Sequence, residues 1–219
     1  MYSYEYPRPS VATDIVAFTL QAHKLAVLLI KRGSKPFEGD WALPGGFLGE
    51  DEELDDCARR ELQEETGVGG VYLEHFKNYS APSRDPRGRV ISVAYLALTG
   101  SSHIRLAATT DAAEAQWFEL DQVPSLAFDH TTILNDALVA LRSRLETNDE
   151  LFSKMLLSLV PDQFTLGLLQ TAYEAVLGRP VDKRNFRSRI HRALPLRETE
   201  MTVGGRHRPA MQYVVSGGS

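Results

Sequence analysis

Apolar stretches divide the first part of the chain into strands placed around one helix. The stretches have the length and β-branched content of buried strands, and they cover residues 13–20, 25–31, 71–80, 90–98 and 115–120. The first two are separated by a short polar segment, which predicts a hairpin. Between the second and third stretches, Leu54, Ala58 and Leu62 follow helical spacing within residues 53–66. This order predicts an α+β sandwich over about residues 1–125.

The apolar period changes near residue 130. Apolar residues then recur at helical spacing, at Ile133, Leu134, Ala137, Leu138, Leu141 and Leu145. They predict an amphipathic helix over residues 130–145, which ends at the polar sequence 147–149. We therefore predict three segments: a first domain at residues 1–129, a linker helix at 130–148 and a second domain at 149–219.

The second domain has the pattern of three helices followed by two short strands. Helices are predicted at 151–159, 165–177 and 183–193, and extended segments at 196–203 and 211–215. Gly178 ends the second helix, and Asp182 is a good N-cap for the third. Helix, turn, basic helix and hairpin in this order are typical of a winged helix-turn-helix, whose third helix enters the major groove of DNA.

The third helix of this domain separates an apolar stripe from a basic face. Phe186, Ile190 and Leu194 form the stripe at positions i, i+4 and i+8. Candidate DNA-contacting residues lie on the opposite face and in the turn between the two strands: Lys183, Arg184, Arg187, Ser188, His191, Arg192, Arg206, His207 and Arg208. Arginine at such positions can reach guanine edges or phosphates. The alternative is a basic face that is merely solvated.

The charge of the chain differs between its two ends. The formal net charge is −5 over 219 residues, yet residues 1–148 carry −8 and residues 149–219 carry +3. Between Arg179 and Arg208 there are nine Lys and Arg residues and three acids. A basic domain attached to an acidic one indicates two functions and is consistent with a nucleic-acid partner.

Composition also restricts the cellular setting. The single cysteine, Cys57, excludes an internal disulfide framework and is expected to be a buried structural thiol. No apolar run reaches membrane-spanning length, and the first ten residues lack the basic and apolar segments of a secretory signal. We therefore expect a cytoplasmic protein without a membrane partner.

A dense set of fixed positions occupies residues 46–68. The sequence GFLGEDEELDDCARRELQEETGV fits the pattern G-x5-E-x7-R-E-U-x-E-E-x-G-U, where U is aliphatic, at every specified position. On a helix, Glu61 and Glu65 fall near the angle of Leu54, and Glu64 lies beside them. Three carboxylates therefore continue a stripe that should bury hydrocarbon.

The carboxylates of this helix are candidates for metal binding and catalysis. Clustered, partly buried acids repel each other unless a cation or a basic partner compensates them. Hard oxygen ligands suit Mg²⁺ or Mn²⁺, so we predict Glu61, Glu64 and Glu65 as metal ligands. Glu64, Glu65 and Arg60 are the catalytic candidates, and Arg60 is expected to pair with Glu52. The alternatives are an acidic solvated face, or an intact motif that serves a binding pocket with little or no turnover.

This motif resembles the Nudix box of hydrolases that cleave a nucleoside diphosphate linked to another moiety. Further segments extend the similarity over nearly the whole chain, at residues 31–33, 41–47, 84–89, 128–130, 164–166 and 178–186. In this order they resemble the NrtR family, the Nudix-related transcriptional regulators of NAD metabolism. The resemblance implies a Nudix α/β/α sandwich followed by a winged helix-turn-helix domain.

The resemblance also implies ligands and partners. Members of the family bind ADP-ribose or a related nucleotide, act as homodimers on double-stranded operator DNA, and usually repress NAD-biosynthesis genes. By this resemblance Gly46 lies at the pyrophosphate end of the pocket. Candidates for phosphate or ribose contacts, with surface turns as the alternative, are Arg32, Arg84, Arg87 and Arg89. Lys183, Arg184, Asn185 and Arg187 match the DNA-contacting element.

Three functions are compatible with these patterns. The chain could be a nucleotide-sensing repressor, a Mg²⁺-dependent hydrolase of ADP-ribose or a similar dinucleotide, or a protein whose second domain binds another protein. We favour the repressor, because a hydrolase has no need of a basic winged helix. Many regulators of this group have a degraded box, whereas this box is complete, so hydrolysis alongside regulation stays open. Residues 130–146 are the predicted element that transmits ligand binding.

Overall fold

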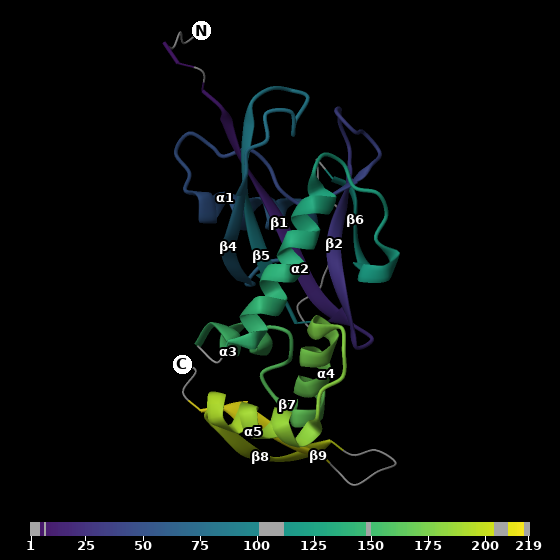
Figure 1. Ribbon diagram of the computed structural model, residues 1–219, viewed down its shortest axis with the longest axis vertical. Helices are drawn as coiled ribbons and strands as arrows, with labels where there is room; N and C mark the ends of the chain where they lie inside the picture. The colour runs from purple at the N-terminus through teal and green to yellow at the C-terminus, as the bar shows by residue number, and fades with distance from the viewer. Residues whose placement is uncertain (1–4, 7, 101–111, 148–149, 204–209, 217–219) are drawn as a thin grey trace.

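The computed structural model describes residues 5–6, 8–100, 112–147, 150–203 and 210–216. It shows two parts stacked along the long axis of the molecule, with a strand-rich part at the N-terminal end and a smaller helical part at the C-terminal end (Figure 1). The predicted contacts of Arg206, His207 and Arg208 lie outside the described residues. None of the helices in the described part of the chain is long and apolar enough to cross a bilayer.

A mixed sheet forms the first part. Its strands are β1 (Ser10–Gln21), β2 (Lys24–Arg32), β3 (Trp41–Ala42), β4 (Tyr72–Tyr79), β5 (Val90–Leu98) and β6 (Ala112–Glu119). They are arranged in the order β3-β2-β1-β5-β4, and β6 pairs with β2. The β1 and β2 strands form the predicted hairpin, while β1 and β5 run parallel. A short 3-10 helix, η2 (Leu120–Gln122), follows β6.

A helix covers each face of this sheet. Successive residues of β1 point to opposite faces, because side chains alternate along a strand. Ile15 packs with Ala58 and Leu62 of α1 (Leu54–Thr66), whereas Phe18 belongs to the cluster that contains Ile133 of α2 (His130–Glu146). Burial on both faces explains why β1 and β2 have nearly continuous apolar sequences. The α/β/α sandwich is therefore confirmed (Figure 1).

The C-terminal part is a winged helix. It contains α3 (Glu150–Leu157), β7 (Phe164–Thr165), α4 (Leu166–Leu177), α5 (Lys183–Ala193), β8 (Leu196–Val203) and β9 (Ala210–Val215), and the strands are ordered β7-β9-β8. Local capping sets the helix bounds, as predicted. Gly178 adopts left-handed φ after α4, and the side chain of Asp182 accepts a hydrogen bond from the backbone N–H of Asn185.

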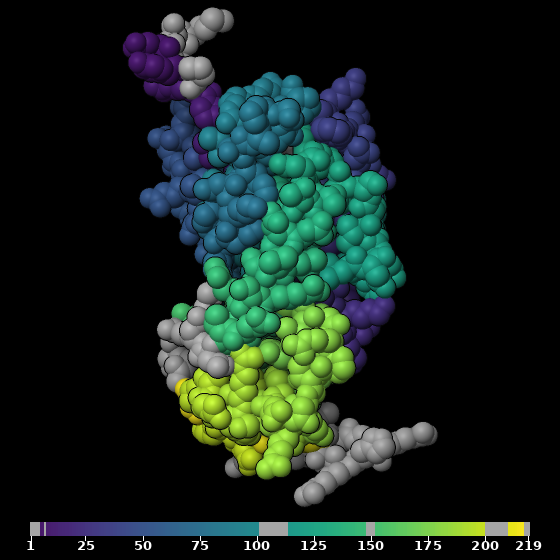
Figure 2. All heavy atoms as spheres, in the orientation of Figure 1, coloured from purple at the N-terminus to yellow at the C-terminus, as the bar shows by residue number. Residues whose placement is uncertain are grey.

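The predicted linker has a larger role than the sequence indicated. The α2 helix forms the second layer of the sandwich, and ion pairs also attach it to β4: Asp136 pairs with Lys77, and Arg144 pairs with Glu74. At its other end α2 packs against α3 and α4. Figure 2 shows α2 lying across both parts of the molecule. One apolar cluster runs from the sheet through α2 into the winged helix, so the two parts share a core.

Candidate functional site

A cavity of about 90 Å³ opens beside the turn that leads into α1. Its walls come from β1, the turn at residues 43–47, the loop before β5 and the residues that precede α2. Three arginines and two aspartates line it, together with Phe47, Phe128 and His130. The cavity is therefore both charged and aromatic.

Two glycines allow the turn to approach its neighbours closely. A Cβ atom on Gly45, whose φ is +150°, would lie 2.0 Å from the carbonyl oxygen of Thr13. A Cβ atom on Gly46 would lie 2.2 Å from a carboxylate oxygen of Glu61. The backbone N–H of Thr13 also donates to the carbonyl of Gly46 at 2.9 Å. The turn is thus held between β1 and the acidic side of α1.

Arg60 organises the acidic side of α1. Its guanidinium donates to both carboxylate oxygens of Glu52, at 2.7 and 2.9 Å, which confirms the predicted pair. It also donates to Glu61 at 2.7 Å and to Glu64 at 3.1 Å. Hydrogen bonds from Arg60 lower the pKa of Glu52 to about 2. Arg60 therefore offsets the negative charge of the three carboxylates around it.

The predicted metal ligands lie together beside the cavity but do not converge on one point. Glu61 and Glu64 accept hydrogen bonds from Arg60, while Glu65 accepts one from the backbone N–H of Gly45 at 2.8 Å. Among the described residues, no three acidic, histidine or cysteine side chains are arranged as a metal site. The donor set still fits a divalent cation, because carboxylate oxygens are the ligands that Mg²⁺ and Mn²⁺ prefer.

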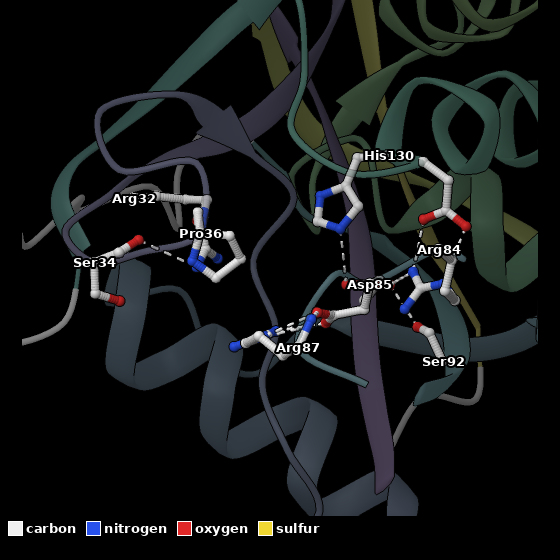
Figure 3. A network of polar contacts seen from close by, with 10 residues as sticks. Arg32, Ser34, Pro36, Arg84, Asp85, Arg87, Ser92 and His130 are labelled. Atoms are coloured by element: carbon white, nitrogen blue, oxygen red, sulfur yellow. Dashed lines mark hydrogen bonds and ion pairs between the residues drawn. The ribbon is translucent and has the colours of Figure 1, made fainter. Parts of the chain in front are cut away.

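The floor of the cavity is a buried ion-pair network. Arg84 donates to Asp14 at 2.9 Å and to Asp129 at 2.7 Å, and its side chain is only 4% exposed. Ser92 donates to the same oxygen of Asp14. Figure 3 shows Arg84 beside Ser92, with His130 nearby. Through Nε and Nη2, Arg84 binds these two carboxylates and so stabilises the floor, and it also lines the cavity, so the ligand contact predicted for it stays a prediction.

His130 connects this floor to α2. Its Nδ1 accepts a hydrogen bond from the backbone N–H of Leu43 at 2.9 Å, which places the ring proton of a neutral imidazole on Nε2. That atom lies 3.3 Å from Asp14. Burial alone would raise the pKa of Asp14, but His130 and Arg84 outweigh it and hold the pKa well below the ordinary value. Asp14 is therefore a buried carboxylate that is ionised and fully partnered.

Two further arginines lie at the entrance and differ in their partners. Arg87 pairs with Asp85 at 2.7 Å and stacks over Phe47 and Phe128, at 4.9 and 5.6 Å from the ring centroids. Arg32 lies 4.9 Å from the centroid of Phe128 and donates to backbone carbonyls, at 2.8 Å to Pro36 and 3.4 Å to Ser34 (Figure 3).

Arg32 is the arginine of this cavity best suited to bind an anion. It forms no ion pair with a carboxylate in the described part of the chain. Burial, followed by the positive charge of Arg87, lowers its pKa. A phosphate beside Arg32 would relieve both effects, because it would supply a negative charge to a partly desolvated cation. The fourth candidate, Arg89, instead donates to the carbonyl of Ser80 at 2.6 Å and does not line the cavity.

Sequence reasoning assigned no role to several residues of this cavity. An aspartate within the apolar strand β1 was a usable signal, because a buried carboxylate requires partners. Residues 128–130 contribute to the family resemblance, but their sequence alone predicts no role for their side chains in the cavity. Phe128, Asp129 and His130 in fact supply a ring for the arginines, an acid for Arg84 and a proton donor for Asp14.

The predicted DNA-contacting residues of α5 share one exposed face. All of the helical candidates are exposed: Lys183, Arg184, Asn185, Arg187, Ser188, His191 and Arg192. Phe186 and Ile190 are buried against the rest of the winged helix, as predicted. The exposed face lies at the end of the molecule opposite its N-terminus (Figure 1). It is therefore accessible to a large partner.

Comparison with known proteins assigns both parts of the chain. A family model described as NUDIX domain matches residues 8–137, and one described as NrtR DNA-binding winged helix domain matches residues 156–215. The chain is 34% identical to the ADPR responsive transcriptional repressor NtrR of Acinetobacter baylyi, over 95% of this chain and 83% of that protein. It is 42% identical to an ADP-ribose pyrophosphatase of Methanocaldococcus jannaschii, over 60% of this chain and 74% of that protein.

A solved structure supports the same assignment. The chain resembles Shewanella oneidensis NrtR complexed with a 27mer DNA, with a TM-score of 0.80 and 33% identity over 94% of this chain and 93% of that chain. The Nudix domain of the same Shewanella protein, complexed with ADP ribose, matches 62% of this chain and 90% of that chain. In that comparison the TM-score is 0.57 and the identity is 34%.

Proposed function

We propose that this chain, which belongs to the NrtR family of Nudix-related regulators, is a cytoplasmic repressor of NAD-metabolism genes that responds to ADP-ribose or a related nucleotide. The observation that carries the proposal is the combination of two sites in one chain. The Nudix part holds a cavity with an arginine, Arg32, that pairs with no carboxylate among the described residues, and the winged helix holds an exposed basic helix. Neither site alone would distinguish a regulator from an enzyme or from a simple DNA-binding protein.

The nucleotide is proposed to place its diphosphate between Arg32 and the turn at Gly45 and Gly46. Arginine offers a fork of donors to phosphate oxygens. The stacked group formed by Phe47 and Arg87 then offers a flat surface to a base or sugar ring. Two relatives named above support this choice of ligand: the ADPR responsive repressor of Acinetobacter baylyi, and the Shewanella Nudix domain complexed with ADP ribose.

The operator is proposed to bind the exposed face of α5. Two copies of the chain would place two such helices about one DNA turn, roughly 34 Å, apart on a near-palindromic site. The nucleotide must bind the DNA-competent and DNA-incompetent forms with different affinity, because otherwise it cannot shift the equilibrium between them.

A substitution of Arg32 tests the nucleotide site. Arg32→Gln is expected to weaken ADP-ribose binding about 10- to 100-fold, since a charge-assisted hydrogen bond contributes roughly 1.5–3 kcal/mol. DNA affinity without nucleotide should be unchanged. Calorimetry measures the first quantity, and fluorescence anisotropy measures the second on a duplex selected from a random library by the protein itself.

Arg89→Gln is the matched control for this experiment. It removes the same charge from the same region, but its guanidinium donates to Ser80 and lies outside the cavity. Equal loss of nucleotide affinity in both variants would show that Arg32 acts through general charge and not as a phosphate contact. If the wild-type protein selects no duplex, the proposed repressor function is wrong.

Hydrolysis of the bound nucleotide is the second candidate function. It is favoured by the complete box and by the 42% identity to an ADP-ribose pyrophosphatase. Glu61, Glu64 and Glu65 would hold Mg²⁺ or Mn²⁺, and the ion would offset charge on the pyrophosphate oxygens. Glu64, the most exposed of the residues paired with Arg60, has the freedom to turn towards an ion or a water molecule.

A substitution of Glu65 separates turnover from binding. Glu65→Gln can still accept the hydrogen bond from Gly45, so the turn should remain intact, while the negative charge is lost. AMP release from ADP-ribose with Mg²⁺ is expected to fall by about 100-fold or more. The control, Glu53→Gln, removes an exposed acid that makes no side-chain cap at the start of α1. If the wild-type protein releases no AMP, the hydrolysis proposal is wrong, and the site would sense the nucleotide without cleaving it.

A further inference from the structure

We propose that Arg189 of α5 is a positioning residue that connects the DNA-contacting helix to the nucleotide domain, and that it does not itself contact DNA. This inference rests on the proposed function, because it concerns how nucleotide binding changes DNA binding. Arg189 lies among the cations of α5, but its environment differs from theirs. It is half-buried, whereas Arg184 and Arg187 are exposed.

The guanidinium of Arg189 contacts several elements at once. It donates to the backbone carbonyls of Leu145 and Thr147 at the C-terminal end of α2, and to the hydroxyl of Tyr173 in α4. It also lies over the ring of Phe152 in α3, 4.4 Å from the centroid. These partners face away from the DNA side of α5. The donors of Arg189 are thus directed into the protein.

The position of this contact suits a cation. The last carbonyls of a helix have no partner within the helix, and the helix dipole makes that end negative. Arg189 therefore caps α2 from a different element. Arg142 makes the reciprocal contact, because it extends from α2 and donates to the carbonyl of Val176 at 3.0 Å, near the end of α4. Two arginines thus cap helices across the boundary between the parts.

The other end of α2 lies at the cavity. Its first residue is His130, which binds Asp14, and the preceding Asp129 binds Arg84. A helix of 17 residues spans about 25 Å. Ion pairs to β4 and the shared apolar cluster pack α2 against the sheet. Because α2 is one continuous helix, a displacement of its first turn at the cavity is expected to reach its C-terminal carbonyls, where Arg189 passes it to α5.

The test compares Arg189→Gln with Arg184→Gln in the full-length protein. In Arg189→Gln we expect ADP-ribose affinity within twofold of wild type. We expect the ratio of DNA affinities without and with ADP-ribose to fall at least threefold towards one. In Arg184→Gln we expect weaker DNA binding with the ratio unchanged. Anisotropy titrations at several salt concentrations measure both quantities.

Two results would overturn the proposal. One is an Arg189→Gln variant with an unchanged ratio. The other is an Arg189→Gln variant whose slope of log DNA affinity against log salt concentration is shallower by about one unit, as expected for a lost phosphate contact. Should Arg189→Gln fail to fold, Tyr173→Phe removes one acceptor of the guanidinium with little change in volume, and the same reduction of the ratio is expected.

Hydrogen exchange supplies a readout that does not require DNA. ADP-ribose is expected to change exchange in α5 of the wild-type protein, and in Arg189→Gln this change should disappear while protection around the cavity persists. An equal change in α5 of both proteins contradicts the proposal. If wild-type protein binds ADP-ribose but no duplex, the proposed function is wrong, and exchange in α5 still shows whether Arg189 connects the two sites.

Discussion

Arg84→Met is expected to destabilise the protein by about 3–5 kcal/mol, the range seen when one partner of a buried ion pair is removed. The methionine fills similar space but leaves Asp14, which is nearly inaccessible, without its arginine. It also removes both donors to Asp129. For a chain of this size the melting temperature should fall by roughly 6–20 °C. Calorimetry of the wild-type and variant proteins measures the change.

The loss of stability in Arg84→Met should depend on pH. The pKa of Asp14 is lowered in the folded protein, so the stability it contributes is present at neutral pH and is lost as pH falls below the ordinary value of about 3.9. Protonated Asp14 no longer needs a cation. The difference between Arg84→Met and wild type should therefore narrow towards acid pH.

Arg89→Met is the control for the Arg84 experiment. It removes an exposed arginine of the same loop that donates to one backbone carbonyl, that of Ser80, so a change in stability below about 1 kcal/mol is expected. A deficit below 1 kcal/mol for Arg84→Met as well, or a deficit that grows towards acid pH, would contradict the role assigned to the buried network.

Local sequence predicted the elements whose ends are set by nearby residues. The bounds of α5 agree with the prediction, because Asp182 caps it and Gly178 precedes it within the same short segment. Strand β5 agrees as well, because its apolar run is bounded by polar loops. In contrast, the two-residue strand β3 exists only through pairing with β2, and no local pattern reveals such a pairing.

The candidate site was predicted less completely than the fold. The pattern of the box predicted the pair between Arg60, within α1, and Glu52, in the loop that precedes α1, only eight residues away. Arg84 and Asp14 are separated by 70 residues, so no sequence window could show that this arginine is occupied. Arginine as a residue type predicts a phosphate contact. The tertiary structure decides which arginine is already paired with carboxylates, as Arg84 is, and which is better placed to bind a phosphate, as Arg32 is.

The role of α2 shows the same limit. Its apolar residues predicted a helix correctly, but an apolar stripe does not specify which surface covers it. Ile133 and Leu141 pack in the cluster that includes both the sheet and the winged helix. A helix that belongs to both parts is a stiffer connection than a free linker, which is why a capping arginine at its end can matter for regulation.

The double variant Arg184→Gln with Arg187→Gln is expected to lose most DNA binding. Each arginine that contacts a phosphate or a guanine edge contributes about 1–3 kcal/mol, so the pair should lower affinity roughly 30-fold or more. If both contact phosphates, the slope of log affinity against log salt should become shallower by about two units. Nucleotide affinity should be unchanged, because α5 lies in the part of the molecule opposite the one that holds α1 and β1 (Figure 1).

A matched double variant distinguishes the effect of the α5 face on DNA affinity from the effect of the net charge of the chain. Arg59→Gln with Arg89→Gln removes the same two charges from exposed positions of the Nudix part. DNA affinity should then change less than threefold, because exposed charges beyond a Debye length of about 10 Å are largely screened. Equal losses in the two double variants would mean that α5 attracts DNA only through the net charge of the chain. The geometry of a basic helix with an apolar inner stripe argues for the opposite result, since Phe186 and Ile190 fix which residues face outward.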